Sequence, residues 1–372
     1  MTTLKELVGS YERDRPLSEA STIPSGWYTD PRIFELERQT VFARSWHLAC
    51  RSAQVAAPGQ FVSLELAGEP LVIVRGQDAV IRGFFNVCRH HAAAVVTAEE
   101  GSASSLRCPY HGWTYGLDGA LKGTPDFSDV CHFDRSTNGL VPVATAIREP
   151  WVFVRLETTG LSLDEYLGPD LSARVEGLQL DRLKWAERRR YSLACNWKVF
   201  VDNYLDGGYH VPHLHKGLDS VLDYSQYTIE NGSRFCLQSS PIVSDGAEPR
   251  TGAVRRGARA SYIWLHPNFM VNVYGEAMDT NLVIPRAVDR TEVVFDFYFA
   301  NASADARERH LSSIAVSEQI QDEDVAICES VQRGLGSRAY STGRLSVRRE
   351  AGEHLFHQLL HDDLRSGLTD QR

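Results

Sequence analysis

The sequence CRHHAAAVVTAEEGSASSLRCPYHGW, residues 88–113, concentrates metal-ligating side chains in a chain of otherwise ordinary composition. Cys88 and His90 form a C-x-H pair, and Cys108 and His111 form a C-x-x-H pair. Such a set can hold a tetrahedral zinc ion or an iron–sulfur cluster in which two imidazoles replace two thiolates. Zinc fingers typically present both cysteines first and both histidines later, whereas here each pair supplies one of each. The order therefore favours a Rieske [2Fe–2S] cluster.

The residues around these pairs favour an all-β fold. Residues 60–85 alternate runs of strand-forming residues with the turns AGEP and RGQD, which predicts a small antiparallel sheet. Residues 113–123 contain an Asp-Gly hairpin turn, and WVFVRLE at 151–157 predicts another strand. We therefore expect one all-β unit over residues 43–157, with the metal ligands in its loops.

Beyond residue 157 the pattern changes to a mixture of helices and strands. Three segments are predicted strands, namely 226–239, 259–274 and 280–300. A long helical pattern occupies residues 304–335 and stops at a pair of glycines. We expect residues 158–372 to form a second unit with an antiparallel sheet, and residues 1–42 to be an N-terminal segment that packs on it. The predicted fold class is α+β.

Composition limits the classes of function. The chain has 372 residues and a formal net charge of −9, which argues against a nucleic-acid or anionic-membrane partner. No apolar run approaches the roughly 20 residues that span a bilayer, and no secretory signal pattern is present. The seven cysteines do not suggest a disulfide framework. We expect small-molecule chemistry in the cytoplasm, or in an organelle if a transit peptide has been removed.

A second metal site is expected, because a cluster that carries one electron at a time suggests a reaction site downstream. Non-haem iron oxygenases hold iron with two histidines and one carboxylate, which leaves positions open for O₂ and substrate. The segment CNWKVFVDNYLDGGYHVPHLH, residues 195–215, supplies three candidates, His210, His213 and His215. Pro212 disfavours helical geometry at the preceding residue, which weakens a helical pair of His210 and His213.

The carboxylate ligand can be located by helical periodicity. On a helical wheel of about 100° per residue, one apolar face of residues 304–335 is formed by Ile314, Ile320, Ile327, Cys328, Val331 and Leu335. Asp324 falls near the middle of this face, Glu323 about a quarter turn away and Asp322 nearly opposite. A charge in the middle of an apolar face is costly to bury unless it is paired or metal-bound. We therefore expect Asp324 to be the third ligand, and Asp322 and Glu323 to belong to a solvated acidic run.

Several passages resemble the Rieske non-haem iron oxygenases, the family of ring-hydroxylating oxygenase alpha subunits. CPYHGWTYGLDG (108–119) is similar to the second Rieske loop, and NWKVFVDNYLDGGYHVPHLH (196–215) is similar to the iron-binding motif of the family. HPNFMVNVYGEAMDTNLVIP (266–285) and VQRGLGSRAYSTGRLS (331–346) resemble the choline monooxygenase group rather than aromatic dioxygenases. The segment EDVAICESVQRGL (323–335) also resembles the family, so the resemblance covers nearly the whole chain.

The resemblance implies an all-β Rieske domain inserted in a helix-grip (SRPBCC or Bet v1-like) catalytic domain. It also implies a [2Fe–2S] cluster, a mononuclear Fe(II), O₂ as co-substrate, and electrons from NAD(P)H through a separate reductase or ferredoxin. A homotrimer is the implied assembly.

The resemblance also assigns ligands. For the cluster it implies four residues: Cys88, His90, Cys108 and His111. It favours His90 over His91, since related proteins usually carry Arg where His91 stands and Gly where Ala92 stands. For the iron it implies His210 and His215, because the first and last histidines of the motif bind the metal in the family.

Polar residues precede the first iron-site histidine. Asp206 and Asn203 lie four and seven residues before His210, so on a continuing helix they share its face. A carboxylate there could orient a ligating imidazole. In the family such an acid links the Rieske cluster of one subunit to the iron of its neighbour, usually from three residues before the histidine, where this chain has Gly207. We choose Asp206 for this role, with Asp202 as the alternative.

A small quaternary ammonium compound, choline or betaine-like, is the expected substrate. Such a cation donates no hydrogen bonds, so aromatic faces and a nearby anion must hold it through cation–π and charge attraction. The aromatic residues in the segments expected to line the pocket are Phe200, Tyr204, Tyr262, Trp264, Phe269 and Tyr274. The expected reaction is C–H hydroxylation or oxidative N-demethylation.

Three alternatives to this function differ in what they predict. An aromatic-ring hydroxylating dioxygenase or monooxygenase would share every metal ligand and differ only in substrate and product. A non-catalytic Rieske electron carrier would lack the second metal site, and a structural zinc protein would be colourless.

Overall fold

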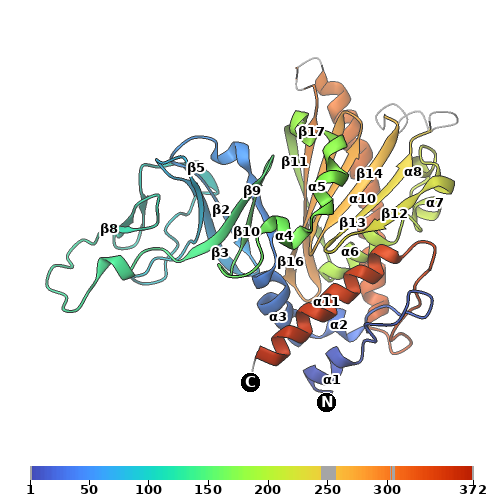
Figure 1. The fold of residues 1–372 in the computed structure, drawn as a ribbon, viewed down its shortest axis with the longest axis horizontal. Helices are drawn as coiled ribbons and strands as arrows, with labels where there is room; N and C mark the ends of the chain where they lie inside the picture. The colour runs from blue at the N-terminus through green and yellow to red at the C-terminus, as the bar shows by residue number, and fades with distance from the viewer. Residues whose placement is uncertain (1, 244–256, 302, 304–305, 371–372) are drawn as a thin grey trace. The chain divides into compact units, whose positions relative to one another are not determined.

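Two compact units form the computed structural model, which describes residues 2–243, 257–301, 303 and 306–370 (Figure 1). One unit, here called the β unit, comprises residues 42–163, and the other, the α+β unit, comprises 1–41 with 164–372. The limits predicted from the sequence for the inserted unit are 43 and 157.

The β unit contains two antiparallel sheets. A seven-stranded sheet has the order β1-β10-β9-β4-β3-β2-β5, and a three-stranded sheet has the order β6-β7-β8. The elements are β1 (His47–Arg51), η2 (Ser52–Val55), β2 (Gln60–Leu66), β3 (Glu69–Arg75), β4 (Ile81–Phe85), β5 (Glu100–Ser102), β6 (Leu106–Arg107), β7 (Thr114–Tyr115), β8 (Leu121–Gly123), η3 (Arg135–Thr137), β9 (Pro142–Arg148) and β10 (Trp151–Arg155).

Strand β3 explains how the core of this unit reaches the metal-ligand loops. Residues 71–74, LVIV, are all fully buried. Because successive side chains of a strand point to opposite faces, the two valines enter one core cluster and the leucine and isoleucine enter another. The cluster of the valines also contains Cys88 and Cys108, so the candidate thiolate ligands are anchored in the core.

The α+β unit is built on a seven-stranded antiparallel sheet of order β11-β17-β16-β15-β14-β13-β12. The strands are β11 (Lys184–Leu193), β12 (Thr228–Asn231), β13 (Phe235–Pro241), β14 (Arg259–Leu265), β15 (Phe269–Tyr274), β16 (Ala277–Ala287) and β17 (Arg290–Phe299).

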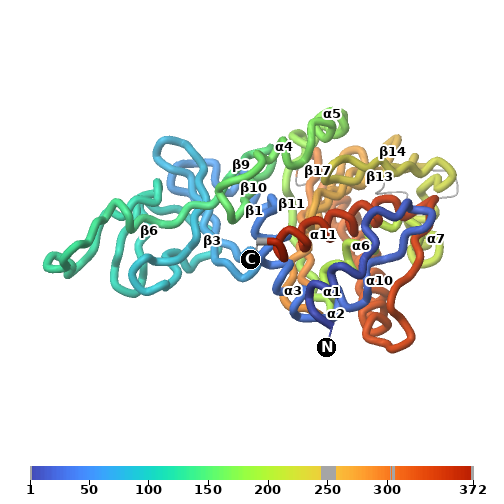
Figure 2. Tube along the Cα trace, turned by 60° about the horizontal axis from the view of Figure 1, so that its bottom comes forward, coloured from blue at the N-terminus to red at the C-terminus, as the bar shows by residue number. Residues whose placement is uncertain are grey.

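Helices cover this sheet and join its ends. The helical elements are α1 (Leu4–Gly9), α2 (Gly26–Thr29), α3 (Pro31–Glu37), η1 (Arg38–Phe42), α4 (Leu163–Leu167), α5 (Asp170–Val175), η4 (Glu176–Leu178), η5 (Leu180–Arg182), α6 (Trp197–Leu205), α7 (Val211–Leu214), α8 (Lys216–Asp219), η6 (Tyr224–Gln226), α10 (Arg307–Leu335) and α11 (Ala351–Asp370). Helix α6 packs against α10, α11 and strand β16. The N-terminal helices lie beside α11 (Figure 2).

A buried ion pair fixes helix α6 to helix α3. Lys198 Nζ lies 2.6 Å from Glu37 Oε1, and Trp197 Nε1 donates to Glu37 Oε2 at 2.9 Å. Burial raises the pKa of Glu37 and lowers the pKa of Lys198, while the attraction between them opposes both shifts. Removing one partner of such a pair typically costs about 3–5 kcal/mol. The start of α6 is therefore held firmly in place.

The register of the sheet places polar side chains in line on the face that α6 and α10 cover. Tyr262 pairs with Asn272, and Asn272 pairs with Asp279. Directly paired residues share a face of the sheet, and all three side chains line one cavity together with residues of α6 and α10. The polar side chains of the sheet therefore form the floor of this cavity.

The predicted fold class, an all-β unit inserted in an α+β unit with an antiparallel sheet, is confirmed. The predicted start of the long helix at residue 304 lies outside the described residues, and α10 is described from Arg307 to Leu335. Helix α11 was not predicted. Among the described helices, none has the length and apolar character needed to cross a membrane.

Candidate metal centres

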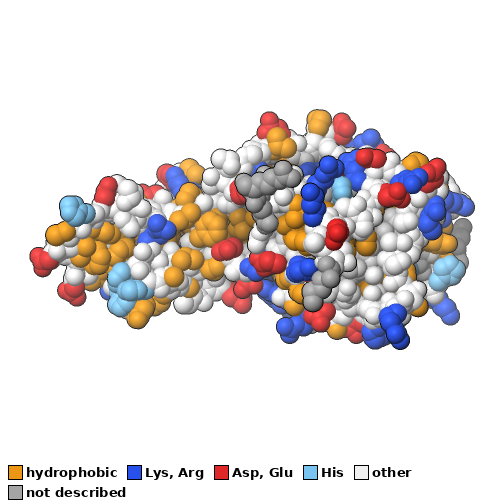
Figure 3. Space-filling view, turned by 90° about the horizontal axis from the view of Figure 1, so that it is seen from below, with side chains coloured by type: hydrophobic (Ala, Val, Ile, Leu, Met, Phe, Trp, Pro, Cys, Tyr) orange, Lys and Arg blue, Asp and Glu red, His pale blue; other side chains and the backbone are white. Residues whose placement is uncertain are grey.

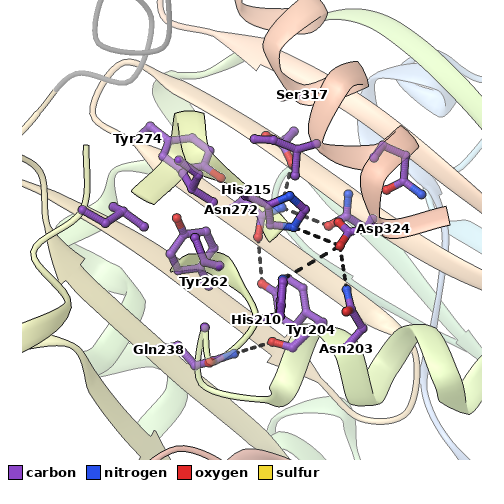
Figure 4. A pocket seen from close by; sticks show the side chains of 18 of the residues that line it. Asn203, Tyr204, His210, His215, Gln238, Tyr262, Asn272, Tyr274, Ser317 and Asp324 are labelled. Atoms are coloured by element: carbon purple, nitrogen blue, oxygen red, sulfur yellow. Dashed lines mark hydrogen bonds and ion pairs between the residues drawn. The ribbon is translucent and has the colours of Figure 1, made fainter. Parts of the chain in front are cut away.

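Two histidines and one aspartate meet beside the cavity of the α+β unit (Figure 4). His215 Nε2 lies 3.0 Å from Asp324 Oδ1, and His210 Nε2 lies 3.8 Å from the same oxygen. All three side chains are largely buried, with exposed fractions of 22% for His210, 1% for His215 and 14% for Asp324. The structure thus brings together the three residues expected to bind iron, and His213 is exposed.

A turn, not a continuing helix, places Asp206 beside His210. Helix α6 ends at Leu205, and Gly207 and Gly208 follow with φ of 67° and 68°. A side chain at Gly207 would clash with the backbone carbonyl oxygen of Arg349, so glycine is required there. The chain is therefore not the continuing helix on which Asp206 and His210 would share a face, although the two side chains still meet.

Asp206 holds this turn and the imidazole together. Asp206 Oδ2 accepts hydrogen bonds from the His210 backbone N–H at 3.0 Å and from His210 Nδ1 at 2.6 Å. Asp202 faces elsewhere, since it accepts from the Tyr28 hydroxyl at 2.6 Å and lies 3.0 Å from His357 Nε2. Of the two candidate acids, Asp206 is the one that contacts an iron-site histidine.

Glu323 performs the same role for the second histidine. His215 Nδ1 lies 2.6 Å from Glu323 Oε2, so the expectation that Glu323 belongs to a solvated run is wrong. Asp322 is exposed as expected.

The predicted apolar face of α10 is only partly buried, because Ile314, Cys328 and Leu335 are buried as expected whereas two other residues are not. Ile327 and Val331 are 37% and 44% exposed. The buried residues of α10 also include Ser313, Ser317 and Gln321, and the last two line the cavity with the polar floor.

Asn203 links α6 to α10 at the candidate iron site. Its Nδ2 donates to Asp324 Oδ1 at 2.9 Å. This hydrogen bond and those to the two histidines fix the orientation of every candidate ligand, as outer partners of metal ligands commonly do.

The electrostatics of the site fit a cation. Burial alone would lower the pKa of His215, but hydrogen bonds and attraction from Asp324 and Glu323 raise it above its ordinary value. Together with Asp206, three carboxylates surround two imidazoles. This excess of negative charge, with both Nε2 atoms directed toward Asp324, suits a divalent ion bound by two imidazoles and one carboxylate.

The cavity of about 770 Å³, open solvent at its mouth included, borders this site. Four of the predicted aromatic residues line it: Phe200, Tyr204, Tyr262 and Tyr274. The prediction is wrong for Phe269 and Trp264. Phe269 precedes Asn272 by an odd number of positions on β15, so it points to the opposite face. Trp264 packs on Phe356 of α11 with ring centroids 5.4 Å apart.

Further residues that were not predicted also line the cavity, including Tyr224, Tyr227, Gln238, Asn272, Asp279, Asn281 and Gln321. The sequences of the strands do contain a pattern that indicates these residues, namely polar residues at positions expected to be buried. Asn272 stands inside the otherwise apolar run FMVNVY, and Asp279 and Asn281 alternate in AMDTNL. Polar residues at buried strand positions indicate a cavity or a hydrogen-bonded network.

In the β unit the two ligand loops share one backbone conformation. The N–H of Cys88 donates to Ala93 O and that of Cys108 to Trp113 O, both at 2.8 Å. Ala92 and Gly112, each four residues after its cysteine, have φ of 59° and 73°. Both thiols are buried, with exposed fractions of 3% and 2%.

The imidazoles stand at the tips of these loops. His90 stacks on Trp113 with ring centroids 4.7 Å apart and lies 4.8 Å from the His111 ring. Its Nδ1 atom is buried and has no hydrogen-bond partner among the described residues. Burial and the neighbouring His91 and His111 lower the pKa of His90, which favours the neutral form that binds metals.

His91 and His111 are exposed, and exposed histidines are visible on the surface of this unit (Figure 3). Nitrogen atoms of His90, His91 and His111 all lie within 4.8 Å of one another. Two buried thiols and an unpartnered buried ring nitrogen fit a cluster held partly by cysteine and partly by histidine. The half-buried position of His90, whose Nδ1 atom is buried, supports it over the exposed His91 as a ligand.

Two family models match the chain. The model of the Rieske [2Fe–2S] domain matches residues 45–134, and that of the ring hydroxylating alpha subunit (catalytic domain) matches residues 180–366. The candidate ligands of each metal site fall inside the corresponding match.

Curated relatives align over nearly the whole chain. The chain is 38% identical to a chloroplastic choline monooxygenase of Arabidopsis thaliana over 98% of this chain and 88% of that protein. It is 32% identical to the carnitine monooxygenase oxygenase subunit of Escherichia coli (strain K12) over 92% of this chain and 93% of that protein. A crystal structure of the quaternary ammonium Rieske monooxygenase CntA with L-carnitine superposes with a TM-score of 0.80 and 28% identity, covering 98% and 99% of the two chains.

Proposed function

This chain belongs to the ring-hydroxylating alpha-subunit family of Rieske oxygenases, and from that premise we propose that it hydroxylates a small quaternary ammonium substrate. The chain is an oxidoreductase that uses O₂, a [2Fe–2S] cluster, mononuclear iron and reductase-supplied electrons. Relatives named for choline and for carnitine support the substrate class. The observation that carries the proposal is a cavity lined by tyrosines and carboxylates beside the candidate iron ligands.

In this proposal two sets of residues hold the metals. His210, His215 and Asp324 hold the iron. The cluster is held by Cys88, His90, Cys108 and His111. When bound, the iron activates O₂ and the cluster supplies electrons one at a time.

The residues around the iron ligands fix tautomers and orientations. Asp206 and Glu323 accept the Nδ1–H of His210 and His215, which leaves each Nε2 lone pair for the metal. Asn203 donates to Asp324 Oδ1 and keeps the carboxylate from turning away.

The aromatic lining can hold a cation without exchanging protons with it. Burial raises the pKa values of Tyr204 and Tyr227 well above the ordinary value for tyrosine, so both phenols stay neutral. Neutral aromatic faces attract a quaternary ammonium through the ring quadrupole. A cation that enters is therefore stabilised beside the reacting centre.

The proposed reaction converts R–H, O₂, two electrons and two protons into R–OH and water. With choline, hydroxylation at the carbinol carbon gives betaine aldehyde hydrate. Hydroxylation at an N-methyl group gives a carbinolamine that collapses to formaldehyde and the demethylated amine.

A finer proposal concerns the assembly of subunits. We propose a homotrimer in which Asp206 links the cluster of one subunit to the iron of its neighbour. A hollow of the α+β unit supports it, because Asp202, Asn203 and Asp206 line this hollow together with Ile327 and Val331, whose apolar side chains are exposed in the single chain.

A cytoplasmic location remains our prediction, and the plant relatives are described as chloroplastic.

Substrate-dependent O₂ uptake tests the function. The iron-loaded protein, supplied with a reductase and NAD(P)H, should consume O₂ and form product with quaternary amines and not with benzoate-like aromatics. Turnover of aromatics with no response to quaternary amines would contradict the proposal.

A further inference from the structure

A buried amide stands beside the candidate iron ligands with no partner of its own. Gln321 of α10 is 1% exposed and lines the cavity, and its Nε2 atom has no hydrogen-bond partner among the described residues. Buried amide nitrogens are nearly always hydrogen-bonded in proteins, and an unpaired one lowers stability. An aliphatic side chain at this position would avoid that loss, so packing alone does not explain the amide.

The position of Gln321 on the helix puts it next to the iron site. It precedes Asp324 by three residues, and residues three apart on a helix lie side by side on one face. Both side chains line the same cavity. Asp324 Oδ1 accepts from Asn203 Nδ2 and lies 3.0 Å from His215 Nε2. A group bound to Gln321 would therefore lie close to the residues that hold the metal.

Two more buried polar atoms that border this cavity lack a partner in the described part of the chain. One is Asn281 Nδ2 on β16, and the other is the hydroxyl of Tyr224 in η6. Asn281 Oδ1 accepts from Asn272 Nδ2 at 2.9 Å, so the nitrogen is the free end of that amide. All three unpaired groups can donate to an oxygen. Three separate elements thus direct unused donors to one cavity.

The aromatic rings line another side of the cavity. Tyr262 and Tyr274 are in edge contact with centroids 5.8 Å apart, and Tyr224 and Tyr227 are stacked at the same separation. Figure 4 shows Tyr262 and Tyr274 on the opposite side of the view from Asp324. The cavity therefore has an aromatic side that suits an ammonium group and a side at α10 that suits an oxygen.

We propose that the Gln321 amide binds an oxygen of the substrate, so that this chain acts on quaternary amines that carry a hydroxyl or carboxylate oxygen rather than on simple alkylammonium ions. A quaternary ammonium group has no acceptor, so only such an oxygen can pair with the amide nitrogen. With choline, the contact places the carbinol carbon, and not an N-methyl group, at the reacting centre. The inference rests on the proposed function and deepens it by naming the residue that orients the substrate.

Calorimetric titration of the iron- and cluster-loaded protein without O₂ tests the contact. The ligands are choline, glycine betaine and propyltrimethylammonium, in which a methyl group replaces the choline hydroxyl. We expect the wild-type protein to bind choline or glycine betaine at least about fivefold more tightly than propyltrimethylammonium, the size of one net hydrogen bond. The tighter of the two identifies the oxygen. In Gln321→Met, which keeps the length of the side chain, this preference should be lost.

The products of choline oxidation give a second measurement. The wild-type protein should form betaine aldehyde in excess over formaldehyde. In Gln321→Met the ratio should shift toward formaldehyde, because the substrate is free to turn in the cavity. A ratio of products does not depend on the amount of folded protein.

Gln332→Met is the matched control. Gln332 lies on the same helix outside the cavity lining, where its Oε1 accepts from the Asn196 backbone N–H at 2.9 Å. Its replacement lowers stability but should leave the ligand preference and the product ratio unchanged.

Two results overturn the inference while leaving the proposed function intact. One is a wild-type protein that binds propyltrimethylammonium as tightly as choline and glycine betaine, a comparison that stands even if the variant does not fold. The other is a Gln321→Met protein that keeps the wild-type preference and product ratio, which would mean that the amide meets only solvent. A wild-type protein that neither binds nor oxidises any quaternary amine would overturn the proposed function and the inference with it.

Discussion

The two candidate metal sites differ in how the chain assembles them. In the β unit all four candidate ligands come from two loops within residues 88–111, and the imidazole of His111 is exposed. In the α+β unit the ligands come from α7 and its flanks and from α10, within residues 210–324, and they are largely buried. The first site is local and open, and the second depends on tertiary structure.

The sites also differ in how their histidines are held. His210 and His215 each have a carboxylate 2.6 Å from Nδ1, whereas His90 stacks on an indole and has an unpartnered Nδ1. Braced imidazoles suit a site where one geometry must be kept for substrate and O₂. An exposed cluster edge suits the entry of electrons from a separate protein.

Removal of the carboxylate ligand should have the largest effect and should separate the two sites. In Asp324→Ala the α+β unit loses a ligand while the loops of the β unit are untouched. We expect turnover below detection and an unchanged visible spectrum of the cluster. Asp322→Ala, an exposed position on the same helix, is the control and should retain activity. Normal product formation by Asp324→Ala would contradict the ligand assignment.

The converse variant is Cys108→Ser. Because this thiol lies in the core cluster of the β unit, we expect loss of the visible spectrum and of reductase-supported turnover. Metal analysis should still find iron bound at the other site. An intact cluster spectrum in this variant would remove Cys108 from the ligand set.

Loss of a bracing carboxylate should have an intermediate effect. Glu323→Gln leaves His215 in place but weakens the hydrogen bond to its Nδ1. Outer partners of this kind typically contribute about 10–100-fold to metal affinity or activity. Iron titration with kcat measurement checks this, and Glu318→Gln, on the same helix and paired with Arg189, is the control. Equal behaviour of the two variants would mean that Glu323 has no role at the site.

Buried ionisable groups are concentrated in the α+β unit, which should make its stability depend on pH. Burial first, and then Asp202 and Glu350, raise the pKa of Glu353, so folding takes up a proton. Below the unfolded pKa of about 4.3, Glu353 does not lower the free energy of unfolding. The free energy of unfolding then falls as pH rises toward the pKa of Glu353 in the folded state.

Glu353→Gln removes this loss. Its advantage should grow with pH and reach about 2–4 °C in Tm near pH 8, corresponding to roughly 1 kcal/mol. Melting curves at pH 5 and pH 8 check the trend. An advantage that shrinks as pH rises would contradict the sign.

The smallest effect is expected in the first ligand loop. Ala92 has a φ of 59°, where the equivalent residue of the second loop is Gly112. Left-handed geometry costs a non-glycine residue about 1–2 kcal/mol, so Ala92→Gly should stabilise the β unit by about 1 kcal/mol. Slower thermal bleaching of the cluster would show it, and faster bleaching would contradict it.

The contrast between the sites also explains how far the sequence could be interpreted. The loops of the β unit depend on spacing that a sequence displays directly, so the candidate ligands there were found from short motifs. On α10, periodicity located Asp324 but misjudged Glu323, because the partner of Glu323 is a histidine more than 100 residues away in the chain. The link from Asp206 to His210 was predicted through a helix that in fact ends at Leu205.

The cavity was the hardest part to predict. Aromatic residues of the strands were chosen by segment, and Phe269 points to the other face while Trp264 packs under α11. The polar floor at Asn272, Asp279 and Asn281 depends on strand register, which pairs residues across neighbouring strands and is not visible in any one of them. Helix α11 was missed altogether, and its contact with α6 places Glu353 in the core.

The central claim is that a quaternary amine is oxidised at the site of His210, His215 and Asp324. The most direct measurement is a single turnover with the reductase omitted, in which chemically reduced, fully loaded protein is mixed with O₂ and methyl-labelled choline. The account predicts betaine aldehyde, or formaldehyde with the demethylated amine, from the wild-type protein and none from Asp324→Ala. Unchanged choline with the wild-type protein, or equal product from both proteins, would contradict it.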